Sequence, residues 1–294
     1  MERDLAVIII NWNTKDLLRQ CIDAVRTNTR RLSSQIIVVD NHSQDGSPEM
    51  VERDFPEVLL IKNKENRGYG GAGNQGLEAA RGKYALILNS DVKVNPHCLD
   101  GMFEFMESRP DIGASSCQLT FPDGTLQHSC RKFPSFKVYV LMLLGIRRLF
   151  PKMRPFREYL MLDWDHSEIR TVDQIMGSFL FLRSRAVEQV GGFDERFWMY
   201  FEEVDLCLRI RKAGWTIVHY PYVSAVHFLS KSSEQWGEIK KIREYQKSLL
   251  KYFKKNGKFH EYYILLAVSR LKYWFLIPAL KLIKVPFQLN ADLY

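Results

Sequence analysis

Apolar runs and amphipathic segments alternate through the first third of the chain. The run LAVIIIN at 5–11 is apolar and β-branched, which is typical of a strand buried on both faces of a parallel sheet. Apolar residues then recur at helical spacing through 15–25, and Thr14 is placed to cap that helix. The alternation continues with strands at 35–40, 58–63 and 84–91 and helices at 47–55 and 72–80. It predicts an α/β layered fold, in which ligands collect where the strands end.

The second half of the chain is less regular, so we expect a mixed sheet. A hairpin turn is predicted at FPDG (121–124), whereas the apolar segment 137–150 is not typical of a sheet strand. Near the C-terminus the composition becomes basic and then apolar. We therefore predict two parts, a domain over 1–235 and a basic, amphipathic helical segment over 236–294.

Charge and cysteine content narrow the class of protein. The formal charge of +8 favours an anionic partner, such as nucleic acid, a phosphorylated substrate or an acidic membrane surface. Much of the basic character lies in 147–157 and 240–258. The five cysteines are odd in number and form no C-x-x-C pair, which favours free thiols in a reducing cytosol. The first strand begins so close to Met1 that no signal peptide is expected.

The glycine-rich stretch NRGYGGAGNQG, at 66–76, fits the G-x-G-x-x-G pattern of a dinucleotide-binding turn through Gly68, Gly70 and Gly73. Such a turn requires the strand to run directly into the glycines, whereas here residues 64–67 intervene. The same glycines would also permit a tight loop with close helix packing, or place backbone beside a nucleotide at the strand ends. The pattern alone therefore disfavours an NAD-dependent oxidoreductase and leaves the other two interpretations open.

Five segments in order carry a family resemblance. They are NWN (11–13), VVDNHSQDGS (38–47), ENRGYGGAGNQG (65–76), LNSDV (88–92) and FEEVDLCLR (201–209). Together they closely resemble the inverting family 2 glycosyltransferases of the GT-A fold, and most nearly the bacterial rhamnosyltransferase-like members that act on lipid-linked glycans. The resemblance implies an α/β, Rossmann-like mixed sheet flanked by helices. Beyond the resembled segments, the basic and then apolar composition predicts a C-terminal helical appendage that associates with a membrane.

The donor-binding residues follow from this resemblance. It implies that Asp40 hydrogen-bonds the pyrimidine base, a role that suits a carboxylate because uracil and thymine present an N3–H. The alternative is that Asp40 caps the following turn, and both can hold together. The set that the resemblance places on the nucleotide sugar is Asn11, Asn13, Asp40, Asn66, Arg67, Gly68, Asn74, Asn89 and Asp91.

The segment LNSDV resembles the family's D-x-D region, which implies that Asp91 ligates Mg²⁺ or Mn²⁺ at the donor diphosphate. Hard divalent ions prefer oxygen ligands. This chain departs from D-x-D because Asn89 occupies the first position and brings no charge. The resemblance also implies that His227 completes the metal shell, although a single histidine at a strand end is commonly structural. For Asp91 the alternative is a turn cap.

The general base is the second member of the acidic pair before D-L-x-x-R in the resembled family, which corresponds to Glu203. An inverting transfer needs a base to take the proton of the attacking hydroxyl. On a helix Glu202 and Glu203 are about 100° apart, so they have different roles. The alternative is a solvated acidic helix N-terminus. Asp205 and Arg209 are expected to form an i, i+4 ion pair.

The acceptor side is expected in the segment that connects the metal region to this helix. The resemblance places Gly177, Ser178, Trp198 and Glu202 there, with the glycine allowing close approach to the sugar and the aromatic ring stacking on it. An aromatic core cluster is the alternative role for Trp198. Asp194 is expected to organise the GGFDE turn rather than to perform chemistry.

The apolar segment 262–283 approaches the length that spans a bilayer, but Arg270, Lys272 and Pro278 interrupt it. We expect a helix lying in the interface of an anionic membrane, or alternatively packed on the domain or on a second subunit of a homodimer. The segment 137–150 is a second candidate for membrane contact, or a lid over the acceptor.

These features together predict a cytoplasmic enzyme, peripheral on the inner face of the plasma membrane. It would move rhamnose from dTDP-rhamnose to a hydroxyl of a lipid-linked glycan, with inversion, in cell-surface polysaccharide synthesis. A UDP-hexose or UDP-N-acetylhexosamine donor is the alternative, and no nucleic-acid partner is implied. A non-catalytic sugar-binding scaffold would bind the donor without turnover, and a dinucleotide oxidoreductase would bind NAD(P)H.

Overall fold

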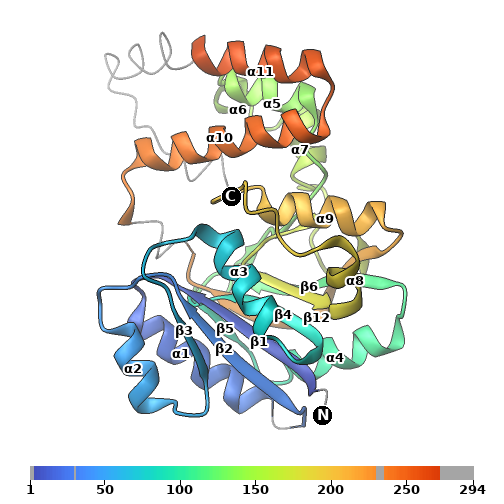
Figure 1. Cartoon of the computed structure of the whole chain (residues 1–294). Helices are drawn as coiled ribbons and strands as arrows, with labels where there is room; N and C mark the ends of the chain where they lie inside the picture. Colours follow the sequence, from blue (N-terminus) through green and yellow to red (C-terminus); the bar gives the residue numbers. More distant parts are fainter. Residues whose placement is uncertain (1–2, 30, 230–234, 272–294) are drawn as a thin grey trace.

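The computed structural model describes residues 3–29, 31–229 and 235–271. A central mixed sheet carries helices on both faces, and a helical cap lies above one end of the sheet (Figure 1). Its main strands are β1 (Arg3–Asn11), β2 (Ser34–Asp40), β3 (Leu59–Lys62), β4 (Gly82–Asn89), β5 (Val92–Val94), β6 (Ile112–Thr120), β11 (Phe179–Arg183) and β12 (Thr216–His227). They follow the order β3-β2-β1-β4-β11-β6-β12-β5. The α/β fold with a mixed sheet is therefore confirmed.

The first four strands are parallel, and antiparallel pairing begins at β11. Short strands complete the structure: β7 (Leu126–Gln127) pairs with β6, β9 (Arg170–Thr171) pairs with β12, and β8 (Cys130–Arg131) pairs with β10 (Gln174–Ile175). The predicted turn at 121–124 leads from β6 to β7, and the Gly124 amide donates to the Phe121 carbonyl at 2.9 Å. The segments WTIVHY and VSAVHF form one strand, β12, with a register shift between Tyr220 and Ser224.

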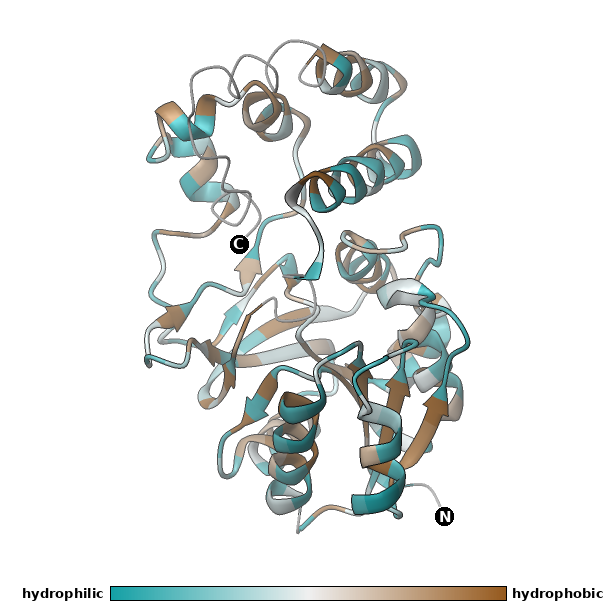
Figure 2. Cartoon of the chain, turned by 90° about the vertical axis from the view of Figure 1, so that its left-hand side faces the viewer, coloured by the Kyte–Doolittle hydropathy of each residue, from teal (hydrophilic) through white to brown (hydrophobic). Residues whose placement is uncertain are grey.

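Both faces of the sheet are buried, as the apolar runs predict. In β1, Leu5, Val7 and Ile9 join the core beneath α1 (Lys15–Asn28), α2 (Ser47–Asp54) and α4 (Cys98–Ser108). Ile8 and Ile10 join the opposite core beneath α3 (Gly68–Ala79), α8 (Ser184–Val190) and α9 (Glu202–Lys212). Successive side chains of a strand point to opposite faces, so a wholly apolar strand serves two layers. Figure 2 shows several of the strands as hydrophobic ribbons between helices of mixed colour.

The helical cap contains α5 (Phe136–Leu143), α6 (Ile146–Leu149), α7 (Arg154–Tyr159), α10 (Glu238–Asn256) and α11 (Phe259–Leu271). Its core includes Tyr139, Phe156, Leu249 and Phe253 and extends to Phe201 at the start of α9. In addition, Lys255 Nζ lies 2.7 Å from buried Asp205 Oδ1 of α9. The cap thus draws on both predicted parts of the chain, and the boundary after residue 235 remains a prediction.

Two local predictions were wrong. The helix predicted at 72–80 begins at Gly68, so most of the glycine-rich stretch is helical. Thr14 precedes α1, but its side chain makes no capping hydrogen bond to that helix. Its hydroxyl donates instead to Asn11 Oδ1 at 2.7 Å, because a buried strand-end amide competes for it.

The predicted interfacial segment 262–283 is described as far as Leu271, and Lys272 and Pro278 lie outside the described residues. The described part belongs to α11, which packs against α10 and α5. Across the described ranges, no helix has both the length and the apolar character needed to cross a membrane.

Candidate active site

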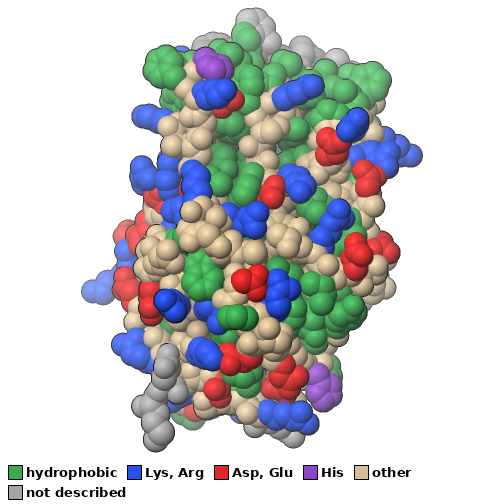
Figure 3. All heavy atoms as spheres, turned by 90° about the vertical axis from the view of Figure 1, so that its right-hand side faces the viewer, with side chains coloured by type: hydrophobic (Ala, Val, Ile, Leu, Met, Phe, Trp, Pro, Cys, Tyr) green, Lys and Arg blue, Asp and Glu red, His purple; other side chains and the backbone are tan. Residues whose placement is uncertain are grey.

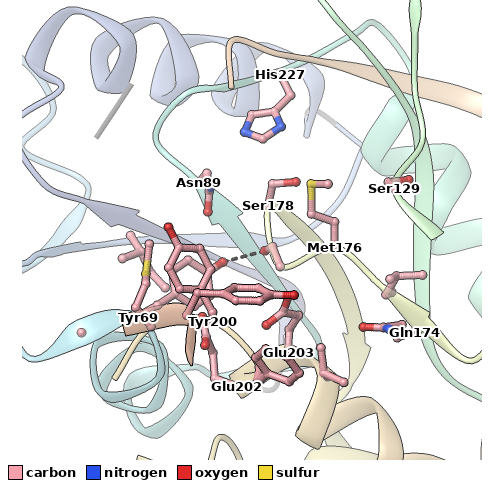
Figure 4. Close-up of a pocket in the computed structure, with 18 of the residues that line it drawn as sticks. Tyr69, Asn89, Ser129, Gln174, Met176, Ser178, Tyr200, Glu202, Glu203 and His227 are labelled. Carbon is pink, nitrogen blue, oxygen red and sulfur yellow. Dashed lines mark hydrogen bonds between the residues drawn. The ribbon is translucent and has the colours of Figure 1, made fainter. Parts of the chain in front are cut away.

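A pocket opens where the parallel strands end, beneath the helical cap (Figure 4). Its walls come from the ends of β1, β4 and β12, from the start of α3, from residues 174–178 and 199–204, and from the cap. Among the predicted site residues, those that line it are Asn66, Gly68, Asn89, Asp91, Gly177, Ser178, Glu202, Glu203 and His227. Residues up to about 160 positions apart are thus brought to one cavity by the strand order.

The predicted base-binding residue Asp40 ends β2 next to the pocket and is 2% exposed. Its Oδ2 accepts a hydrogen bond from Asn11 Nδ2 at 2.8 Å, and its Oδ1 accepts from the Ser43 amide at 2.8 Å. The Ser43 bond is the turn-capping contact that the sequence offered as an alternative. Asn11, fully buried at the end of β1, fixes the same carboxylate. Neither bond tests the predicted contact with a base.

Asn41 is a pocket residue that sequence reasoning did not select. Its Nδ2 donates to Asn66 Oδ1 and to the Gly68 carbonyl, each at 3.0 Å, and its Oδ1 accepts from the Arg67 amide at 2.9 Å. One side chain therefore ties the end of β2 to the loop that starts α3. Its position directly after Asp40, at the end of a buried strand, could have marked Asn41 as a candidate pocket residue.

The glycines of α3 allow close packing. Gly68 has φ of +77°, and a Cβ there would lie 2.1 Å from the Trp198 carbonyl oxygen. A Cβ at Gly73 would meet Phe193 at 2.7 Å, and one at Gly76 would meet Ile8 at 2.1 Å. Close helix packing therefore accounts for Gly73 and Gly76, whereas Gly68 also lines the pocket.

Five predicted donor residues do not line the pocket: Asp40 and Asn11, which lie beside it at the strand ends, and Asn13, Asn74 and Arg67. Asn13 Oδ1 accepts from the Gln44 amide at 2.7 Å. Asn74 Nδ2 donates to the Phe193 carbonyl at 3.0 Å and holds the loop before α9 against α3. Arg67 precedes α3, and its Nη2 lies 3.8 Å from Glu195 Oε2 of the loop before α9; both side chains are exposed. A direct role for them on the donor remains a prediction.

The predicted metal ligands meet because β5 pairs with the end of β12. That pairing aligns Val92 with His227, so Asp91 Oδ1 lies 3.3 Å from His227 Nε2, and both side chains are buried. The contact lacks hydrogen-bond geometry, since His227 Nε2 has no hydrogen-bond partner among the described residues. On the other side of the ring, Nδ1 lies 3.0 Å from Gln127 Oε1. If the ring proton is on Nδ1, where Gln127 can accept it, the lone pair of Nε2 faces Asp91. Metal-binding histidines are commonly fixed in this way by a partner on their other ring nitrogen.

Asn89, the first position of the D-x-D region, ends β4 and is held through its backbone amide, which donates to the Ser178 carbonyl at 3.1 Å. Its Oδ1 is buried at the pocket wall and has no hydrogen-bond partner among the described residues. An unsatisfied buried acceptor that lines a pocket is suited to a ligand that donates, such as a hydroxyl or a water molecule.

The acidic pair begins α9, after Tyr200 and Phe201, which both adopt positive φ angles of +67° and +70°. This uncommon backbone turns Glu202 and Glu203 into the pocket. Burial, followed by repulsion from Glu203, raises the pKa of Glu202 well above its usual value. Burial also raises the pKa of Glu203, but backbone hydrogen bonds and nearby Arg131 oppose that effect. Burial therefore favours the neutral form of both acids, and Glu203 differs from Glu202 in having Arg131 nearby to favour its charged form.

Arg131 lines the pocket beside Glu203, and sequence reasoning did not select it. Burial opposes its charge, but nearby acidic groups, among them Glu203, raise its pKa. Three phenols form a chain, with Tyr139 Oη at 2.6 Å from Tyr159 Oη and 3.1 Å from Tyr245 Oη. This polar wall combines β8, α5, α7 and α10, so the cap contributes directly to the pocket.

Gly177 and Ser178 lie between the metal pair and the acidic pair. Tyr69 Oη donates to the Gly177 carbonyl at 2.6 Å, and a Cβ on Gly177 would lie 3.7 Å from Glu203 Cβ. Ser178 Oγ is buried and lacks a hydrogen-bond partner in the described part of the chain. Trp198 instead packs near Asn66 and stacks on Trp236, with ring centroids 5.1 Å apart. It does not line the pocket, whereas Trp236 does.

Asp194 and the pair Asp205–Arg209 have the structural roles that the sequence predicts. Asp194 Oδ1 accepts from the Arg196 amide at 3.1 Å and so organises the turn. Arg209 Nε lies 2.7 Å from Asp205 Oδ2, and its other nitrogens donate to the Val190 and Gly192 carbonyls.

Comparison with known proteins decides the class of this site. Residues 6–168 match the sequence model of the family described as Glycosyl transferase family 2. The chain belongs to the family 2 glycosyltransferases. An N-acetylglucosaminyl-diphospho-decaprenol L-rhamnosyltransferase of Mycobacterium tuberculosis is 31% identical over 78% of this chain and 77% of its own length. A rhamnosyltransferase of Escherichia coli is 28% identical over 58% of this chain and 61% of its own length.

Solved structures confirm the GT-A fold of this glycosyltransferase. A mannosyltransferase from Pyrobaculum calidifontis, in complex with GDP-Man and Mn²⁺, aligns with a TM-score of 0.55 over 95% of this chain and 83% of its own, at 17% identity. GalNAc-T7, solved with UDP, GalNAc and Mn²⁺, aligns with a TM-score of 0.58 over 77% of this chain and 44% of its own, at 13% identity. The predicted family, enzyme class and fold are thereby confirmed.

Proposed function

We propose that this glycosyltransferase moves rhamnose from dTDP-rhamnose to a hydroxyl of a lipid-linked saccharide, with inversion at the anomeric carbon. The observation that carries the proposal is the placement of the Asp91–His227 pair and Glu203 in one pocket. The similarity to the Mycobacterium tuberculosis rhamnosyltransferase, which covers 78% of this chain, supports the choice of rhamnose and of a lipid-linked acceptor. The similarity to the Escherichia coli rhamnosyltransferase supports the choice of rhamnose.

The nucleotide would lie at the strand ends, against Asp40 and the Asn41–Asn66–Gly68 network. Asp40 would accept from the base N3–H, while Asn11 and Ser43 keep the carboxylate in place. Gly68 brings backbone to the pocket surface at the start of α3. Donor groups would there replace water at a site that is already ordered, which limits the entropic cost of binding.

The residues around Asp91 fit a divalent ion. An oxygen ligand and a histidine nitrogen lie 3.3 Å apart, and Gln127 holds the other ring nitrogen. Asp91 and His227 would hold Mg²⁺ or Mn²⁺, which supplies Lewis-acid stabilisation of the departing diphosphate when bound. Asn89 would hold a donor hydroxyl or water through its unpaired Oδ1.

Glu203 would act as the general base. The acceptor oxygen attacks the anomeric carbon, the bond from that carbon to the diphosphate oxygen breaks, and the hydroxyl proton passes to Glu203. Glu202, whose pKa burial raises furthest, would remain protonated and hold the sugar by donating a hydrogen bond. Arg131 and its phenol neighbours would bind the anionic part of a lipid-linked acceptor.

The helical cap supports a peripheral position at an anionic membrane. Leu149, Phe150 and Phe259 are 72%, 58% and 79% exposed, and Arg147 and Arg148 adjoin the first two. Figure 3 shows hydrophobic side chains gathered at the cap end of the molecule, with Lys and Arg among them. Apolar side chains beside cations suit an interface of acidic lipid headgroups. The double substitution Leu149→Glu with Phe150→Glu replaces two exposed apolar side chains by negative charges. It should reduce sedimentation with anionic vesicles, and unchanged sedimentation would argue against this contact.

The experiment that tests the proposed reaction is a transfer assay with a panel of donors. Purified protein is mixed with a synthetic GlcNAc-diphospho-lipid, Mn²⁺ or Mg²⁺, and dTDP-rhamnose, UDP-glucose or UDP-N-acetylglucosamine, and products are identified by mass. The proposal expects a deoxyhexose adduct from dTDP-rhamnose alone. Transfer from a UDP-sugar with none from dTDP-rhamnose would replace the donor but keep the enzyme class. Donor binding without any transfer to this or related lipid-linked saccharides would favour a scaffold.

A further inference from the structure

A second cluster of metal-binding side chains lies outside the pocket. It contains Cys130 of β8, His166 of the segment between α7 and β9, and His219 of β12. All three are buried, and one ligand atom of each lies within 4.8 Å of the others. The residues are far apart in sequence, so the tertiary fold alone brings a thiol and two imidazoles together. None of them lines the candidate active site.

Three of the four ring nitrogens of His166 and His219 are not satisfied by hydrogen bonds. Both nitrogens of His166 and Nδ1 of His219 are buried without a hydrogen-bond partner among the described residues. Trp164 stacks on the His166 ring at a centroid distance of 4.1 Å and meets His219 edge-on at 5.1 Å. Buried polar atoms without partners are rare, because each loses its bonds to water and gains none. A bound cation would satisfy one acceptor nitrogen of each ring.

The surroundings also orient the rings. His219 Nε2 lies 3.3 Å from the His166 backbone carbonyl, so a proton on Nε2 would be donated there and Nδ1 would remain an acceptor. A backbone carbonyl behind the ring is a common second partner of metal-binding histidines. His166 itself has φ of +59°, an uncommon backbone for a residue other than glycine. The fold thus holds this histidine in place at a conformational cost.

We infer that Cys130, His166 and His219 form a structural zinc site, distinct from the Asp91–His227 pair. A thiolate with two imidazoles is a ligand set that zinc prefers, whereas Mg²⁺ and Mn²⁺ prefer oxygen. The fourth ligand would be His128, whose Nδ1 is unpaired among the described residues and whose ring lies 4.9 Å from that of His166, or a water molecule. Binding releases the thiol proton of Cys130 to solvent.

Such a site would stabilise the acceptor side of the pocket. Ser129 and Arg131 flank Cys130 and both line the pocket, while β12 carries His219 and ends at His227. A metal ion between β8 and β12 would fix the wall that carries Arg131 relative to the strand that carries the catalytic metal ligand. Short β8 has a two-residue pairing with β10, so a cross-link would add considerably to its order.

Metal analysis of the full-length protein tests the site. The wild type, purified without chelators from zinc-supplemented cells, is analysed by mass spectrometry for metals beside Cys130→Ser and His219→Gln. Asp91→Asn, which alters the other site, and Cys98→Ala, which removes a different buried thiol, are the matched controls. We expect about one zinc per chain in the wild type and both controls, and less than a tenth of that in the two cluster variants.

A second measurement covers variants that fail to fold. Wild-type protein is stripped with a chelator and titrated with Co²⁺, and thiolate-to-cobalt absorption is recorded together with the melting temperature. The inference expects this absorption, its loss on adding Zn²⁺, and a higher melting temperature with either ion. Absence of zinc and of cobalt absorption in folded wild type would overturn it, as would full zinc content in folded Cys130→Ser.

Discussion

Replacing Glu203 by glutamine tests the assignment of the general base with little change in shape. The carboxylate lines the pocket, and a glutamine of the same size can still accept the backbone hydrogen bonds that Glu203 accepts. Donor affinity should therefore be retained. The amide cannot accept the acceptor proton, and Glu202 is poorly suited to replace Glu203 because burial raises its pKa and favours its protonated form.

The size of the effect follows from this arrangement. General-base catalysis contributes about 10²–10⁴-fold, so Glu203→Gln should raise the barrier by about 3–5 kcal/mol. Single-turnover transfer with saturating donor and acceptor measures this step apart from product release. In the wild type, kcat/KM should fall as pH is lowered through the raised pKa of Glu203, and the variant should lose that limb.

The matched control is Glu202→Gln, which exchanges a protonated acid for an amide of the same shape. Its transfer rate should stay within about tenfold of the wild type, because the neutral group can still donate a hydrogen bond. A near-normal rate for Glu203→Gln, or a larger loss in Glu202→Gln, would refute the assignment of the base.

Three further predictions concern the donor pocket, the metal pair and the buried acid. Gly68→Ala should weaken donor binding at least tenfold in calorimetry, because its Cβ would lie 2.1 Å from a carbonyl oxygen; Gly124→Ala, with similar φ and open space, should not. Gln127→Leu removes the hydrogen-bond acceptor beside His227 Nδ1. This variant should need about 10–100-fold more Mn²⁺ for half-maximal activity, and an unchanged requirement would contradict the role of Gln127. Because the folded state raises the pKa of Glu202 above 4.5, wild-type stability should fall as pH rises from about that value toward the folded pKa; melting curves of Glu202→Gln should show a flatter dependence.

Local sequence pattern was sufficient for the central sheet and for the order of the motifs. Apolar runs such as 5–11 and 84–91 became β1 and β4 because a strand buried on both faces leaves no polar position to obscure it. The same pattern did not predict the start of α3, because that turn of the helix contains several glycines and glycine is a poor helix former. There, the close approach of Gly68 to Trp198 requires a residue without a side chain, and that requirement overrides helix propensity.

The site could be predicted only where a family motif marked it. Asp91, Glu203 and His227 lie in recognisable segments, and the structure places them at one pocket. Gln127 was not accessible to that reasoning, because it contacts His227 across 100 positions of sequence. Arg131 joins Glu203 only through the fold of β8 beneath the cap. These contacts depend on which strands pair, which local pattern does not specify.

The anomeric configuration of the product distinguishes inverting transfer of rhamnose from the other possible reactions of this enzyme. The enzyme is incubated with dTDP-rhamnose, Mn²⁺ and a GlcNAc-diphospho-lipid, and the anomeric carbon–hydrogen coupling of the purified product is measured by NMR. Inverting transfer should give a rhamnosyl linkage of configuration opposite to that of the donor, formed by wild type and nearly absent with Glu203→Gln. A product that retains the donor configuration, or undiminished formation by that variant, would contradict it.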